Sequence, residues 1–220
     1  MISEMILVPV EGATLAGDFV LPTSARAVVL FAHGSGSSRH SRRNRSVAAD
    51  LRTAGLGTLL IDLLTEQEER RDVRTAEYRF DIPMLGRRVV AAIDWLTAQP
   101  DTRDLPVVLF GASTGAAAAL LAAAERPERV LTVISRGGRP DLADEALAAV
   151  RASVLLIVGG EDHDVLGLNE DAARRLHAPH ALSVVPGATH LFEEPGALEQ
   201  VAATARQWCE DRLRAEPDET

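Results

Sequence analysis

Apolar residues along the chain gather in short uninterrupted runs, separated by stretches with helical spacing. Runs typical of strands occur at residues 5–10, 14–20, 27–32, 57–61, 106–110, 130–134, 154–158 and 182–185. The later runs are continuously apolar rather than alternating, as expected for strands buried on both faces of a sheet. The first two runs straddle Glu11 and Gly12 with no helix between them, which predicts a β-hairpin leading into the sheet.

Segments with apolar positions three and four residues apart lie between the later runs. The clearest is 81–99, where Leu85, Val89 and Ile93 share one helical face. Further helices are expected at 41–54, 114–125, 141–150, 168–176 and 196–213. This alternation predicts an α/β fold, a mostly parallel sheet covered by helices on both faces.

The remaining segments set the boundaries of the domain. Residues 63–79 are mostly charged and are expected to form a solvated loop. No repeat or linker divides the 220 residues, which suit one domain over 1–214. The polar residues 215–220 are expected to form a flexible tail.

Composition excludes several classes of protein. The net charge of −9 argues against nucleic acid as a partner. A single cysteine, Cys209, rules out an internal disulfide and a cysteine-based zinc site, and neither a metal nor a cofactor is expected. The longest apolar run, 116–124, is too short to cross a membrane, and the N-terminus does not resemble a signal peptide. A cytoplasmic location without membrane contact is therefore expected, and a homodimer is left open.

A candidate nucleophile lies in the sequence VVLFGASTG at 107–115. An apolar strand, then Gly-x-Ser-x-Gly, then an alanine-rich helix is the context that places a reactive serine on a sharp turn. The two flanking positions crowd that turn, and both are glycine. Ser113 is therefore the candidate nucleophile; the alternative is a chance Gly–Ser turn between a strand and a helix.

A serine nucleophile needs a base, and the base needs an orienting acid. In folds that carry this motif the acid and then the histidine follow the serine along the chain. His190 follows the last strand, so it is the candidate base. The acid is expected in the loop after 154–158, where Asp162 is preferred and Asp164 and Glu161 remain alternatives.

The glycine-rich segment at 33–38 follows the third strand and suits a loop whose N–H groups bind an oxyanion. The expected donors are the N–H groups of Ser35 and Thr114, and His33 is expected to be a structural hydrogen-bonding residue of this loop. A phosphate-binding loop is the weaker interpretation, because the Gly-Lys-Ser/Thr that completes such loops is absent.

Four arginines, Arg39, Arg42, Arg43 and Arg45, come directly after this loop. A cluster of positive charge at the mouth of the site would attract a substrate that carries a carboxylate or phosphate. The alternative is a solvated helix start with paired charges. Our hypothesis is that at least one of these arginines, Arg39 before the others, helps to form the pocket or binds there.

The chain resembles the α/β-hydrolase superfamily, and within it the small dienelactone-hydrolase-like proteins. The resemblance rests on HGSGSSRHSRRN at 33–44, GASTG at 111–115, GGEDHDV at 159–165 and GATHLFEEPGAL at 187–198. It implies an eight-stranded, three-layer fold with a triad of Ser113, His190 and Asp162. Dienelactone hydrolases proper have cysteine where this chain has Ser113, and Cys209 in the last helix cannot replace it. The resemblance therefore implies general ester hydrolysis.

The expected function is hydrolysis of small-molecule carboxylic esters or lactones of small to medium acyl size, through an acyl-enzyme. An acyltransferase or a peptidase with the same triad, or a binding protein of the same fold, are the alternatives. The interval between Ser113 and Asp162 is filled by the expected helices and strands and leaves no room for a lid domain. The site should be open, rimmed by 135–141 and 63–79.

Overall fold

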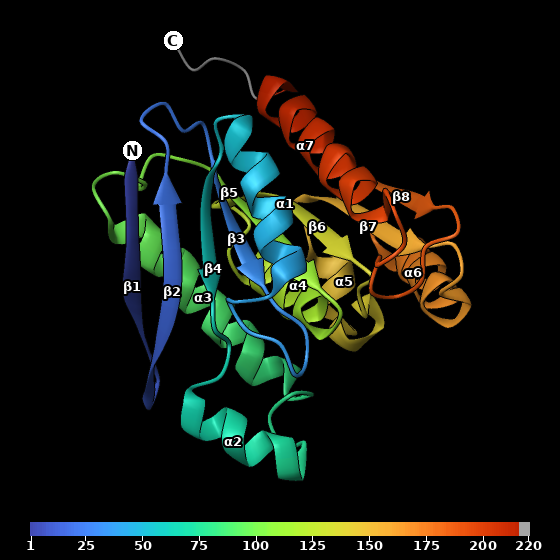
Figure 1. Ribbon diagram of the computed structural model, residues 1–220, viewed down its shortest axis with the longest axis horizontal. Helices are drawn as coiled ribbons and strands as arrows, with labels where there is room; N and C mark the ends of the chain where they lie inside the picture. The colour runs from blue at the N-terminus through green and yellow to red at the C-terminus, as the bar shows by residue number, and fades with distance from the viewer. Residues whose placement is uncertain (216–220) are drawn as a thin grey trace.

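The computed structural model describes residues 1–215, which fold around one eight-stranded sheet (Figure 1). Its strand order is β1-β2-β4-β3-β5-β6-β7-β8. β2 runs antiparallel to both of its neighbours, β1 and β4, and the other neighbouring strands are parallel. The strands are β1 (Ile2–Val10), β2 (Ala13–Leu21), β3 (Val28–Ala32), β4 (Gly57–Ile61), β5 (Val107–Ala112), β6 (Val130–Arg136), β7 (Ser153–Gly159) and β8 (His180–Val185).

Helices cover both faces of the sheet, which confirms the predicted three-layer α/β-hydrolase fold without a separate lid domain. α1 and α7 pack together on one face, and α3 to α6 cover the other (Figure 1). The helices are α1 (Arg42–Thr53), α2 (Glu66–Thr75), α3 (Ile82–Ala98), α4 (Thr114–Glu125), the short 3-10 helix η1 (Pro140–Ala143), α5 (Ala146–Ala149), α6 (His163–Arg175) and α7 (Ala197–Ala215).

The central strands are buried along their whole length, as their continuous apolar runs predicted. Every residue of β3, β4 and β5 is buried. The two faces of the sheet carry separate apolar clusters, and Phe31 packs on Phe110 in the cluster beneath α1 and α7 with ring centroids 4.8 Å apart. Burial of such side chains stabilises the fold by roughly 1.5–3 kcal/mol each.

The register of the parallel strands brings their carboxyl ends to one edge of the sheet. Ala32 at the end of β3 pairs with Gly111, and Ala112 at the end of β5 pairs with Arg136. Gly159 at the end of β7 pairs with Val185 at the end of β8. The loops expected to carry the nucleophile, the acid, the base and the oxyanion donors therefore leave the sheet at the same edge.

The prediction that 63–79 forms a solvated loop is wrong, because its central part is the helix α2. Thr65 and Glu68 form a capping box: the Thr65 hydroxyl accepts from the Glu68 N–H, and the Glu68 carboxylate accepts from the Thr65 N–H. Glu68 also makes two hydrogen bonds with the buried Arg88 of α3, at 2.6 and 2.8 Å. Paired charges, rather than an apolar face, hold this helix in place.

Two other helices differ from the sequence prediction. The segment 141–150 is divided into η1 and α5, because Asp144 adopts a positive φ of 45° that no α-helix continues through. α6 begins at His163, ahead of the predicted start at Leu168. The tail predicted for 215–220 lies outside the described residues except for Ala215, the last residue of α7. In residues 1–215, no helix has the length and apolar character required to cross a membrane.

Candidate active site

Ser113 joins β5 to α4 in a strained backbone conformation, with φ 51° and ψ −123°. A non-glycine residue held in such a conformation costs of order 1–3 kcal/mol, and strain of this kind concentrates at functional sites. A Cβ on Gly111 would lie 2.4 Å from the Cα of Ala116, and one on Gly115 would lie 2.2 Å from the carbonyl oxygen of Ala32. The tight turn therefore requires glycine on both sides of Ser113.

The structure brings His190 and Asp162 into direct contact. The Nδ1–H of His190 donates to Oδ2 of Asp162 over 2.6 Å. This bond leaves Nε2 of the same imidazole as the nitrogen free to accept a proton. The Asp162 side chain is 14% exposed and the His190 side chain 39%, so the pair lies partly open to solvent.

Asp162 differs from its two alternatives in where its carboxylate lies. It stands at the N-cap of α6, but its side chain makes no capping hydrogen bond and contacts His190 instead. Asp164 is exposed, and the exposed Glu161 lies 3.9 Å from the Nε2 of His163. Of the three carboxylates considered from the sequence, Asp162 is the one that contacts His190.

Backbone contacts hold the His190 loop against the end of β7. The Glu161 N–H donates to the carbonyl oxygen of Ala188 over 2.9 Å. A Cβ on Gly159 would lie 2.3 Å from that same oxygen, so the absence of a side chain at this position permits the close approach. This packing fixes the distance between the loops that carry Asp162 and His190.

Ser113 and His190 line the same cavity, which has a volume of about 190 Å³. Its walls are formed by the loop at 33–38, the start of α1, the end of β6 and the loop that carries His190. Its lining residues are Gly34, Ser35, Ser37, Ser41, Arg43, Asn44, Ala112, Ser113, Arg136, His190 and Leu191.

The loop after β3 approaches Ser113 closely. A Cβ on Gly34 would lie 2.9 Å from the Cβ of Ser113 and 3.6 Å from its Oγ. The Ser35 N–H, an expected oxyanion donor, donates to the Thr114 hydroxyl over 3.0 Å. The Thr114 N–H, the other expected donor, lies at the first position of α4, where a helix leaves backbone N–H groups without intrahelical partners.

His33 is a structural residue of this loop, as the sequence predicted. Its ring is buried, with Nδ1 donating to the carbonyl oxygen of Gly34 over 2.9 Å and Nε2 accepting from the Leu63 N–H over 2.9 Å. Burial lowers the pKa of His33 below 6.5, and the contact with Gly34 and the charge of Asp62 oppose that shift without cancelling it. Through these two hydrogen bonds, a neutral His33 connects the loop at 33–38 to the segment after β4.

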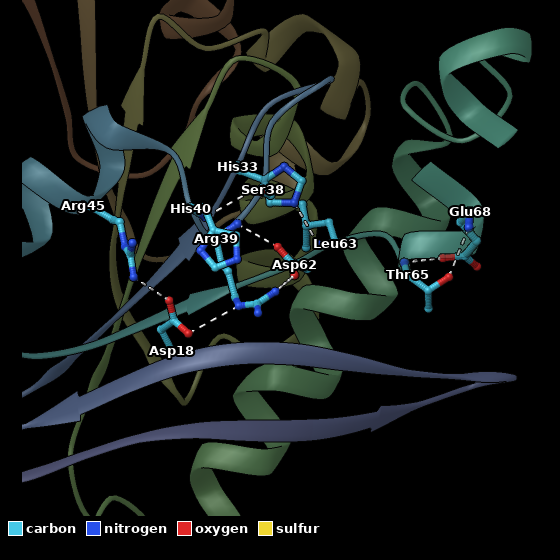
Figure 2. A network of polar contacts seen from close by, with 10 residues as sticks. All are labelled: Asp18, His33, Ser38, Arg39, His40, Arg45, Asp62, Leu63, Thr65 and Glu68. Atoms are coloured by element: carbon cyan, nitrogen blue, oxygen red, sulfur yellow. Dashed lines mark hydrogen bonds and ion pairs between the residues drawn. The ribbon is translucent and has the colours of Figure 1, made fainter. Parts of the chain in front are cut away.

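Arg39 lies between the carboxylates of Asp18 and Asp62 (Figure 2). Its guanidinium pairs with Asp62 and, over 3.3 Å, with Asp18, and its N–H donates to Asp62 over 2.7 Å. Burial opposes the charge of Arg39, but the hydrogen bonds and charges of the two carboxylates raise its pKa. Arg39 is not among the residues that line the Ser113 cavity, so its proposed role in substrate binding stays a prediction without a contact to support it.

Two other arginines line that cavity: Arg43, one of the four arginines considered from the sequence, and Arg136, which the sequence did not indicate as a site residue. Arg136 ends β6, directly beside Ser113, and only 6% of it is exposed. Burial, followed by the charge of Arg43, lowers the pKa of Arg136 to about 10. Arg43 belongs to the cluster noted in the sequence and pairs with the exposed Glu193 over 3.2 Å.

A second, smaller cavity of about 90 Å³ is also lined by residues of the loop at 33–38. Gly34, Ser35 and Ser37 line both cavities. Its remaining wall includes Leu63, Leu64 and Leu85 together with residues of α2. Residues of 63–79 therefore line this second cavity, and none of them lines the cavity that contains Ser113, so the predicted rim of the Ser113 site stays a prediction.

Cys209 is buried in α7 and takes no part in this site. Burial, reinforced by the charge of Glu210, raises its pKa to about 12, which keeps the thiol protonated. Within residues 1–215, no three side chains of histidine, cysteine, aspartate or glutamate are grouped as a metal site would require.

Comparisons with known proteins find relatives of this chain by sequence and by fold. A Mycobacterium tuberculosis protein whose name proposes a phosphoribosyl transferase is 53% identical over 210 residues, which are 96% of this chain and 46% of that protein. This chain thus spans about half the length of the curated relatives it matches first.

Solved structures give matches over full-length chains. The dienelactone hydrolase of Anabaena variabilis is 56% identical with a TM-score of 0.93, covering 95% of this chain and 97% of that one. Est1E from Butyrivibrio proteoclasticus is 14% identical with a TM-score of 0.80, covering 96% and 99%, and shares the fold. Residues 15–212 match the dienelactone hydrolase family along nearly the whole sheet. The chain therefore belongs to the dienelactone hydrolase family, as an α/β-hydrolase.

Proposed function

We propose that the protein is a serine hydrolase that cleaves carboxylic esters through Ser113, His190 and Asp162. The observation that carries the proposal is the 2.6 Å hydrogen bond between His190 and Asp162, in a cavity that His190 shares with Ser113 on its strained turn. These are the nucleophile, base and orienting acid that acyl transfer requires. Membership of the dienelactone hydrolase family supports the same reaction class.

The reaction begins with attack of the Ser113 Oγ on the ester carbonyl. Nε2 of His190 takes the serine proton, while Asp162 holds Nδ1–H and stabilises the imidazolium that forms. The same imidazolium then protonates the leaving alcohol, and an acyl-Ser113 intermediate remains. Water attacks this intermediate with His190 again as the base, which releases the acid and restores Ser113.

The tetrahedral oxyanion is bound by backbone N–H groups in this proposal. The Thr114 N–H at the start of α4 and the Ser35 N–H are the donors, each worth about 3–4 kcal/mol of barrier. The Ser35 N–H donates to the Thr114 hydroxyl in the free site, so it must turn from that hydroxyl to the oxyanion as the carbonyl is attacked.

Other functions rest on weaker support. Transfer of the acyl group to an alcohol or amine, or cleavage of an amide, uses the same residues. The name of the Mycobacterium tuberculosis relative proposes phosphoribosyl transfer, but this chain covers 46% of that protein. Competition between water and added alcohols or amines for the acyl group separates hydrolysis from transfer.

Hydrolysis of p-nitrophenyl acetate, butyrate and octanoate tests the proposal. The wild-type protein is expected to show turnover, and the Ser113→Ala variant to lose at least about a thousandfold in kcat. Ser46→Ala removes an exposed hydroxyl from α1, outside this cavity, and serves as the matched control, with kcat within a few-fold of wild type. Undiminished hydrolysis by folded Ser113→Ala, or no turnover on any of these esters by the wild type, would contradict the proposal.

A further inference from the structure

The cavity beside Ser113 carries positive charge without a carboxylate in its walls. Its charged lining side chains are Arg43 and Arg136, and none of its lining residues is aspartate or glutamate. The chain as a whole carries a net charge of −9, so the charge in this cavity is opposite in sign to that of the whole protein. A positive cavity in an acidic protein focuses its field on an anionic ligand.

Arg136 is the most unusual of these groups, because it is a buried cation with no anionic partner among the residues that the structure describes. Its Nη2 donates to the side-chain oxygen of Asn44 over 3.2 Å, and its guanidinium lies 5.8 Å from the centre of the Phe192 ring. Its buried Nε has no hydrogen-bond partner among residues 1–215. An uncompensated buried charge is strongly unfavourable for folding, so an anionic ligand that paired with Arg136 would offset that cost.

Two further donors converge on the same cavity. The Nε of Arg43 is also buried and also without a partner among the described residues, and the Glu193 that pairs with Arg43 is 67% exposed. The 12-residue helix α1 begins at the cavity wall, where its N-cap Ser41 and its residues Arg43 and Asn44 are lining residues. Its first turn contains no acidic residue, so the positive end of the helix dipole is not neutralised.

We propose that Arg136, Arg43 and the first turn of α1 form a phosphate subsite, and that the substrate is an ester that also carries a phosphate monoester. The inference rests on the proposed ester hydrolysis, because the subsite shares its cavity with Ser113 and His190. The phosphate replaces the carboxylate that Arg136 lacks, and it holds the ester carbonyl against Ser113.

A phosphate suits this subsite better than a carboxylate for two reasons. Two guanidinium groups match the two charges of a phosphate monoester, whereas a carboxylate brings only one. The first turn of α1 adds backbone N–H donors to the two guanidinium groups, and the three oxygens of a phosphate monoester offer these donors more acceptors than the two oxygens of a carboxylate. The cavity of about 190 Å³ has room for such a group beside the nucleophile.

Binding of inorganic phosphate by isothermal titration calorimetry tests the subsite without any catalytic step. At constant ionic strength, Arg136→Met and Arg43→Met should each weaken phosphate binding by about tenfold or more. Arg45→Met is the matched control: Arg45 belongs to the same helix, but it is exposed and pairs with Asp18, so this variant should bind like wild type. Binding of succinate as tight as that of phosphate, or equal phosphate binding by all variants, would overturn the proposal.

Thermal unfolding separates binding from structural support. Arg136→Met removes a buried unpaired charge, so its Tm without phosphate should equal or exceed that of wild type, while the rise in Tm on adding phosphate should disappear. A lowered Tm with an unchanged response to phosphate would assign Arg136 a structural role and overturn the proposal. The partly exposed Arg43 carries the same test if Arg136→Met does not fold.

Kinetics then connect the subsite to the reaction. The p-nitrophenyl ester of phosphonopropionic acid should have a KM at least about tenfold below that of p-nitrophenyl butyrate, and Arg136→Met should abolish the difference. Equal KM values in the wild type would overturn the substrate assignment while leaving ester hydrolysis intact. Phosphate binding in a protein that hydrolyses no ester would instead uphold the subsite and count against the proposed hydrolysis.

Discussion

Asp162 occupies the N-cap of α6 without capping it. Aspartate is among the best capping residues, and here its carboxylate accepts from His190 instead of from the helix. A side chain that gives up a local hydrogen bond worth about 1 kcal/mol for a distant partner marks a functional constraint. At the scale of single residues, the site is therefore indicated by Asp162, whose tertiary contact with His190 replaces the capping hydrogen bond that its position favours.

Separate replacement of Asp162 and of the nearby Asp164 by asparagine tests the assignment of Asp162 as the acid. Asp162→Asn should lower kcat by about 10⁴, because the imidazole of His190 loses the partner that fixes its tautomer. Asp164→Asn, two residues further along and exposed, should remain within a few-fold of wild type. The measurement is kcat on p-nitrophenyl butyrate, and the reverse ranking would transfer the acid role to Asp164.

The sequence located the candidate site residues only as far as chain order and strand ends define them. Ser113 and His190 follow from those two features, and Asp162 was the preferred one of three. Chain order and strand ends do not indicate Arg136. The absence of an anionic partner for it among residues 1–215 results from how α1 and the His190 loop pack around the end of β6. Arg39 was predicted to bind substrate because it comes directly after the glycine-rich loop, but Asp18 and Asp62, on other segments, neutralise its charge.

At the scale of elements, the strands and long helices agree with their apolar periodicity, and α2 does not. Its start was present in the sequence as Thr65 and Glu68, three residues apart, which is the pattern of a capping box. The mostly charged composition concealed it, because periodicity detects helices through an apolar face. Its attachment through Arg88 is a contact between distant segments that periodicity cannot predict.

Two helical glycines give opposite expectations for the same substitution. Gly115→Ala should lower the free energy of unfolding by about 2–4 kcal/mol, because its Cβ would lie 2.2 Å from a carbonyl oxygen of β3. Gly167→Ala in α6 meets no atom within 4 Å and should raise it by up to about 1 kcal/mol. Urea unfolding measures both; an unchanged stability of Gly115→Ala would contradict the close packing of α4 on β3.

At the scale of the whole molecule, the fold was predictable because alternation of strand and helix leaves few arrangements of a parallel sheet. That topology brings the ends of β3, β5, β7 and β8 to one edge, and this alone predicts that their loops meet. The distribution of charge over the molecule could not be predicted from the sequence in the same way. The net charge of −9 says nothing of a cavity whose walls carry two arginines and no carboxylate.

The most direct test of the account is labelling of the protein with a fluorophosphonate, followed by intact-protein and peptide mass spectrometry. Wild type should gain one adduct, located on Ser113, and Ser113→Ala should gain none. His190→Ala should react far more slowly, while His163→Ala, which alters an exposed histidine beside Asp162, should react at the wild-type rate. A folded wild-type protein that forms no adduct, or forms it on another serine, would contradict the claim that Ser113 is an activated nucleophile.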